Sequence, residues 1–62
     1  MKTPFTRTVG MNICRARSHR EWTQLRLAAE ADVDLTTVQR WESGRAVPVG
    51  FDLLKLSIAL RT

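Results

Sequence analysis

Apolar side chains recur three and four positions apart along most of this chain, which is the spacing of one face of an α-helix. The first such series contains Val9, Ile13 and Ala16, with arginines between them, and predicts a helix from about Val9 to His19 or Arg20. No segment alternates apolar and polar residues as a half-buried strand does. The pattern therefore predicts an all-α fold.

A second, shorter helix is predicted over QLRLAAEA, residues 24–31. Thr23 precedes it and can cap its first turn through the side-chain oxygen. Leu27 marks the side of this helix that faces inward. Asp32 and Val33 then make a tight turn into the next element.

The third predicted helix covers residues 35–43 and is amphipathic. Asp34 is a suitable N-cap, because its carboxylate can accept hydrogen bonds from the free amides of the first turn. Val38 and Trp41 lie three residues apart and face inward, and Gly44 ends the helix. The other sides of this helix carry Thr36, Thr37, Gln39 and Arg40.

The two ends of the chain differ in character. Residues 1–8 contain Pro4 and no helical periodicity, and we expect an N-terminal arm carrying Lys2 and Arg7, followed by a single domain over residues 9–62. After Pro48, a last helix is predicted from about Gly50 to Leu60. Its large apolar residues outnumber those that one inward stripe requires: Phe51, Leu53, Leu54, Leu56, Ile58 and Leu60.

Composition narrows the class of protein. Sixty-two residues make one domain, too small for a large catalytic cleft. Ten Lys and Arg against six Asp and Glu give a net charge of +4, which favours a polyanionic partner or an anionic membrane surface. One cysteine, Cys14, and one histidine, His19, exclude an intrachain disulfide and a zinc site of these two residue types. We expect neither metal nor cofactor.

No apolar run approaches the roughly 20 residues of a membrane span, and the N-terminus lacks the apolar stretch of a signal peptide. We therefore expect no membrane partner and a cytoplasmic location.

Two short helices joined by a tight turn, the second exposing a polar side on a basic domain, are the parts of a helix-turn-helix that reads DNA. Residues at the start of the second helix reach base edges first in the major groove. Threonine can offer a hydroxyl or a methyl group, glutamine pairs with adenine and arginine with guanine. A solvated helix surface would have the same composition, so composition alone leaves both interpretations open. The positions concerned are Leu35, Thr36, Gln39 and Arg40.

Several motifs occur in a specific order. Arg17 lies in the first helix, TQLRLA spans residues 23–28, Val33 and Val38 are the apolar residues around the turn, and WESG ends the third helix at residues 41–44. With Pro48 and the apolar LLKLSIAL segment, this order resembles the phage-repressor helix-turn-helix family, the lambda-type repressor and Cro-like domains. The resemblance covers about Val9 to Leu60. It implies a compact lambda-repressor-like domain of four or five helices.

The resemblance departs from the family at three points. Asp32 stands where the family usually has a turn glycine, and aspartate tolerates positive φ better than most residues. Leu35 occupies a position that is more often polar, so a contact with a thymine methyl group or a sugar is expected there. The sequence ends at Thr62, before the short fifth helix that many relatives use in dimerisation.

The resemblance assigns a role to each candidate residue. Base contacts fall on Leu35, Thr36, Gln39 and Arg40. Contacts with the DNA backbone fall on Thr23, Gln24, Thr37, Ser43 and Arg45, with Gln24 holding a phosphate at the start of the second helix. Arg17 and Glu42 form a structural ion pair between the first and third helices. Trp22 and Trp41 belong to the core. In the absence of a fifth helix, the surplus apolar residues suggest a dimer through Leu54, Ile58 and Leu60.

The leading hypothesis is a sequence-specific regulator of double-stranded DNA, of Cro or repressor type. A homodimer would bind a palindromic operator and block transcription, in the bacterial nucleoid and encoded by a phage, a plasmid or the cell. The alternative is a protein-interaction module, antitoxin-like or a co-regulator, that binds a partner protein through its apolar C-terminal helix. A catalytic role is not expected, because no His/Asp/Ser set or carboxylate pair has a plausible site.

Overall fold

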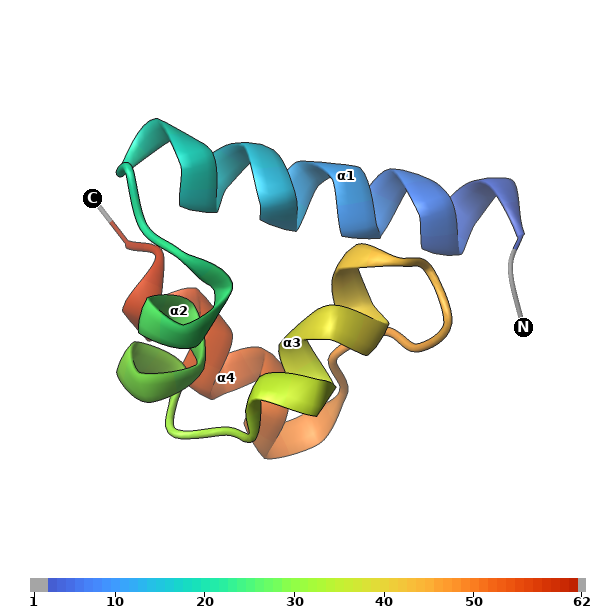
Figure 1. The fold of residues 1–62 in the computed structure, drawn as a ribbon. Coiled ribbons are helices and arrows are strands. Elements are labelled where there is room, and N and C mark those ends of the chain that lie inside the picture. Colours follow the sequence, from blue (N-terminus) through green and yellow to red (C-terminus); the bar gives the residue numbers. More distant parts are fainter. Residues whose placement is uncertain (1–2, 62) are drawn as a thin grey trace.

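The computed structural model describes residues 3–61, and within this range the chain forms four helices and no strand. The predicted all-α fold is confirmed. α1 lies along one side of the molecule, and the other three helices gather beneath it (Figure 1). The bounds are α1 Pro4–His19, α2 Gln24–Ala31, α3 Leu35–Glu42 and α4 Gly50–Ala59.

The start of α1 differs from the prediction. We expected an arm up to residue 8, but the helix begins at Pro4, so an arm over residues 4–8 is wrong. Thr3 and Thr6 form a reciprocal capping box: the Thr6 amide donates to Thr3 Oγ1 over 3.1 Å, and the Thr3 amide donates to Thr6 Oγ1 over 2.7 Å. Proline suits the first helical position, where its missing amide hydrogen would have no partner. Lys2 lies outside the described residues.

The first three helices end in the same way. In each, the residue that follows the last turn has a left-handed backbone: Glu21 with φ 59°, Asp32 with φ 56° and Gly44 with φ 81°. The next amide then donates back to a carbonyl five residues earlier, as Val33 does to Ala28 over 3.0 Å. This Schellman arrangement satisfies carbonyls that the helix leaves unpaired. The expected turn at Asp32 therefore forms without glycine.

Asp34 takes the predicted N-cap position of α3, but its side chain makes no capping hydrogen bond. The prediction that the carboxylate caps the helix is wrong. The backbone carbonyl of Asp34 accepts from the amides of Thr37, over 3.0 Å, and Val38, over 3.3 Å. The exposed side chain is left to water, which solvates its charge without cost.

Buried side chains from all four helices form the core. α3 packs against α1 and α2, and α2 packs against α4. Trp41, Leu27 and Val38 are its largest fully buried side chains, which confirms the inward face predicted for α3. Trp22, predicted as core, is half-buried at the edge of this cluster. Two guanidinium groups approach its ring: the Cζ atom of Arg20 lies 5.8 Å from the ring centroid, and that of Arg26 lies 5.0 Å from it.

Polar contacts join α4 to the other helices. Lys55 Nζ approaches the carbonyl oxygen of Asp32 at 3.3 Å and its carboxylate at 3.7 Å, so a cation lies at the carbonyl end of α2. A cation at this end is attracted to the partial negative charge of the helix dipole and stabilises the helix. At the C-terminal end of α4, Arg20 Nη2 donates to the carbonyl of Leu60. These contacts tie the middle of α4 to the end of α2 and its C-terminal end to the end of α1.

Candidate nucleic-acid interface

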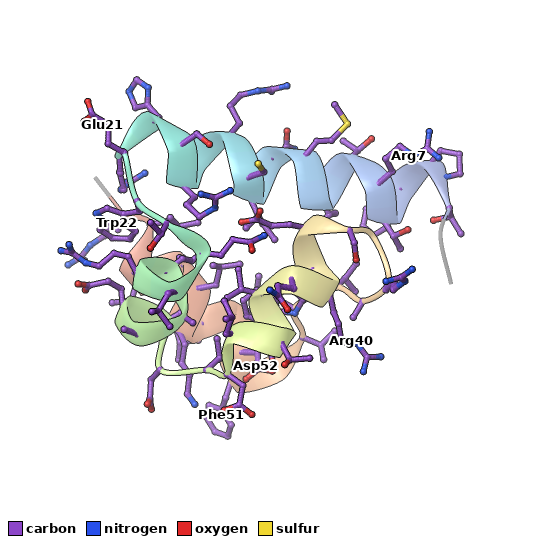
Figure 2. The ribbon with its side chains drawn as sticks, viewed as in Figure 1. Arg7, Glu21, Trp22, Arg40, Phe51 and Asp52 are labelled. Carbon is purple, nitrogen blue, oxygen red and sulfur yellow. The ribbon has the colours of Figure 1, made fainter. Side chains whose placement is uncertain are left out.

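The two sides of α3 have opposite roles. Val38 and Trp41 are buried on one side, while Thr36, Gln39 and Arg40 are exposed on the other. Arg40 points away from the body of the molecule into solvent (Figure 2). Because a rigid core holds the inner side, the outer side chains have a fixed direction relative to the domain.

A surface hollow of about 280 Å³ lies over α3 and the residues that follow it. It brings together five of the nine residues predicted to contact DNA. Hydroxyl, amide and guanidinium groups therefore meet at one place on the surface. Its lining residues are Thr36, Gln39, Arg40, Ser43 and Arg45.

Leu35 and Thr37, the other candidates on α3, lie outside this hollow. Leu35 begins the helix with 36% of its surface exposed. Thr37 is half-buried. Ser43, within the hollow, already donates from its hydroxyl to the carbonyl of Arg40 over 3.1 Å.

The remaining two candidates stand at the start of α2. Thr23 Oγ1 accepts from the Arg26 amide over 3.0 Å, which confirms Thr23 as the cap of this helix. The Leu27 amide donates to the Thr23 carbonyl. The first amide of α2 that donates in these hydrogen bonds is therefore that of Arg26. The amides of Gln24 and Leu25 come before it in the chain. Such amides at a helix N-terminus suit an anion.

The predicted ion pair between Arg17 and Glu42 forms and joins α1 to the end of α3. Arg17 Nε donates to Glu42 Oε2 over 2.7 Å, and Nη2 donates to Oε1 over 3.1 Å. The two side chains are only 16% and 7% exposed. Arg17 Nη1 also donates to the carbonyl of Trp22 over 2.7 Å, which holds the segment between α1 and α2. Cys14, half-buried beside this group, accepts from Arg17 at 3.5 Å.

A third side chain joins this pair. Gln24 Nε2 donates to Glu42 Oε1 over 3.0 Å, and so links the start of α2 to the end of α3. This bond could not be predicted from the sequence. Nothing in the spacing of the two residues signals it, because helix packing alone brings them together.

Electrostatics in this cluster favour the charged forms. Burial raises the pKa of the Glu42 carboxyl. Hydrogen bonds from Arg17 and Gln24, together with the charge of Arg17, lower this pKa by more than burial raises it. The net effect places the pKa of Glu42 below its ordinary value of 4.5. The hydrogen bond to Glu42 raises the pKa of Arg17 above its ordinary value. Both groups therefore stay ionised at neutral pH.

The three dimerisation candidates do not share one environment. Leu54 and Ile58 are 54% and 59% exposed on α4. Leu60 is half-buried and packs on the core, so it belongs to the inner side of its own domain. Phe51 is a further exposed residue, 80% accessible, and points away from the molecule (Figure 2). It lies three residues before Leu54, on the same side of the helix.

Other kinds of site find no support in residues 3–61. No three His, Cys, Asp or Glu side chains of this range come together in a way that could hold a metal ion. No helix in the same range is long and apolar enough to cross a membrane.

Comparison with known families decides the class of this domain. The model of the helix-turn-helix family matches residues 14–62, which include the whole arrangement of α2, turn and α3. The chain belongs to the helix-turn-helix family. This is the lambda-repressor type that the motifs predicted. Searches among curated proteins and among solved structures find no match.

Membership makes this helix-turn-helix protein a DNA-binding transcription regulator. In the family arrangement, α3 is the recognition helix and α2 lies across the DNA backbone.

Proposed function

We propose that this helix-turn-helix protein is a Cro- or repressor-type regulator that binds a palindromic operator as a homodimer and blocks transcription. The observation that carries the proposal is the hollow over α3. It gathers five polar residues of the predicted DNA contacts on one surface. The net charge of +4 is complementary to the negative charge of a DNA duplex.

In this proposal, α3 enters the major groove by its N-terminal end. Arg40 donates to a guanine, Gln39 to an adenine, and Thr36 makes a single hydrogen bond or a methyl contact. Leu35 meets a thymine methyl group or a sugar. Each good base contact discriminates by about 1–3 kcal/mol, so three or four of them suffice for a short half-site.

The remaining candidates would hold the domain in register on the phosphates. Gln24 and the first amides of α2 take one phosphate, with Thr23 beside them. Ser43 and Arg45 follow the backbone beyond the end of α3, with Thr37 as the half-buried member of this group. Arg45 also has the length to enter a narrow minor groove. These contacts supply affinity without sequence preference.

A homodimer formed through α4 would bind two half-sites of the operator. Leu54 and Ile58, with Phe51 beside them, form an exposed apolar stripe that a second copy would cover. Two-fold symmetry would then place the two α3 helices about 34 Å apart, one turn of DNA. A dimer seated on a promoter blocks polymerase by steric exclusion and requires neither catalysis nor a ligand.

The test is a binding series with an operator selected from random duplexes and with a scrambled duplex of the same composition. Phosphate contacts predict that affinity falls steeply with salt on both duplexes. Base contacts predict that the operator binds about 10³-fold or more tightly than the scrambled duplex. Equal affinity for the two duplexes would contradict the proposal that the protein is a sequence-specific regulator.

The exposed stripe on α4 also favours a second function. An antitoxin-like or co-regulatory module would use the same apolar residues to bind a partner protein. The two functions predict different behaviour of the purified chain. A regulator forms homodimers that shift operator DNA, whereas an interaction module binds duplex weakly and co-purifies with a partner in a stable hetero-complex.

A further inference from the structure

The side chains of Gln24 and Glu42 meet across two helices, in a contact that the DNA-binding roles above do not explain. Gln24 opens α2 and Glu42 closes α3. The bond runs from Gln24 Nε2 to Glu42 Oε1 over 3.0 Å. An ionised carboxylate can only accept hydrogen bonds. The amide nitrogen of Gln24, and not its carbonyl oxygen, must therefore face Glu42.

This constraint determines which atoms of Gln24 remain for another partner. The side-chain amide has two N–H groups, and Glu42 takes one of them. The second N–H stays available at the start of α2, near the backbone amides of Gln24 and Leu25. An unanchored amide can rotate and present its carbonyl oxygen, which repels a phosphate. The anchored amide presents a donor.

The anchor itself is held in place. Two hydrogen bonds from Arg17, of 2.7 and 3.1 Å, restrain the Glu42 carboxylate, which is 7% exposed. Arg17 also neutralises the charge of Glu42. Without that neutralisation, a carboxylate so close to a bound phosphate would oppose DNA binding.

We propose that Glu42 is a positioning residue for DNA binding: its Arg17-paired carboxylate holds the Gln24 amide so that the second N–H donates to a DNA phosphate. The proposal rests on the proposed phosphate contact of Gln24. It gives the buried pair a second role. Besides joining α1 to α3, the pair acts on DNA affinity through one side chain of α2.

Two double variants separate positioning from structural support. Both carry Arg17→Met, one with Glu42→Gln and the other with Glu42→Leu. Neither leaves a buried charge unpaired, and the replacements are similar in volume. They differ in one respect, because glutamine at position 42 can still accept from Gln24 and leucine cannot.

Affinity for the wild-type operator is measured at one salt concentration, below the melting temperature of every variant. We expect the leucine variant to bind about tenfold more weakly than the glutamine variant, the effect of one hydrogen bond to a charged group. The ratio should return to one when Gln24→Ala is added to both. Equal affinity of the two double variants, or a tenfold ratio that persists with Gln24→Ala, overturns the positioning role.

A measurement on the wild-type protein needs no substitution at position 42. In NMR spectra, the two side-chain amide protons of Gln24 should respond differently when operator duplex is added. One proton should shift on contact with phosphate, while the other keeps its bond to Glu42. If neither proton shifts, the proposal is overturned. A wild-type protein that prefers operator over scrambled DNA while the variant ratio equals one refutes the positioning role alone. A wild-type protein without that preference refutes the proposed function.

Discussion

The backbone of Gly10 lies against the carbonyl group of Trp41, at the crossing of α1 and α3. A Cβ atom placed on Gly10 would be 2.5 Å from the Trp41 oxygen and 2.8 Å from that of Glu42. These are backbone atoms at the end of a packed helix and cannot move away without shifting α3. Glycine therefore sets the distance at which α1 packs against α3.

Gly10→Ala should lower the free energy of unfolding by about 1–3 kcal/mol, the usual cost of overpacking. Alanine would otherwise favour the helix at this position, so a loss of stability isolates the steric clash. Denaturant unfolding measures it. Asn12→Ala, at an exposed position of the same helix, is the control and should leave stability unchanged or slightly raised. If both variants are equally stable, the close packing at Gly10 is not a constraint.

The left-handed backbone at Glu21 offers a stabilising change. A non-glycine residue with φ 59° carries a steric cost of about 1–2 kcal/mol, part of which glycine relieves at the expense of a more flexible unfolded chain. Glu21→Gly should raise the free energy of unfolding by about 0.5–1 kcal/mol. Glu21→Gln keeps the strain and removes the charge, and it should have no such effect. A comparable gain in the glutamine variant would assign the change to charge instead of backbone strain.

Stability should depend on the ionisation of Glu42. Its pKa is lower in the folded protein than its ordinary value of 4.5, so the stabilisation is complete above pH 4.5 and is lost as the pH falls through the folded-state pKa. Unfolding measured from pH 6 to pH 2 should show this decline. The Arg17→Met, Glu42→Leu variant should show a shallower one, because its buried pair no longer titrates. Parallel pH profiles of the two proteins would contradict the role assigned to the pair.

Arg40 should contribute sequence preference in addition to charge. Arg40→Ala is expected to cost about 1–3 kcal/mol on the selected operator and to relax the base preference at one position of each half-site. Arg15→Ala removes the same charge from an exposed position of α1 and serves as the control. It should leave the base preference intact. Selection of random duplexes by the two variants makes the comparison, and identical selected sequences would argue against a base contact by Arg40.

The apolar stripe on α4 should control association. Leu54→Glu with Ile58→Glu places charges in the proposed dimer interface, and sedimentation should show a monomer where the wild type is a dimer. Because both side chains are more than half exposed, the fold of the monomer should persist. Asn12→Glu adds a charge at an exposed position of α1 and not on the stripe of α4, and it is expected to remain dimeric. A monomeric wild type would remove the basis for a two-fold operator.

The helices and their inner faces could be predicted because the signals are local. Thr23 caps α2, Gly44 ends α3, and the three-residue spacing of Val38 and Trp41 identifies the inner side. Each signal depends on residues within one or two turns of each other. The interpretation of Pro4 as part of an arm was wrong although the deciding signal is equally local. The capping box of Thr3 and Thr6 makes Pro4 a first helical residue and not a helix breaker.

Four helices, a tight turn at Asp32 and a polar side on the third helix could be predicted from the amino-acid sequence alone, because periodicity and capping act over a few residues. Packing determined the rest. It turned Leu60 inward, brought Gly10 against Trp41, and joined Gln24 to the carboxylate of Glu42. These relationships arise between residues far apart in the sequence, and they depend on crossing distances that exist only once the helices have met.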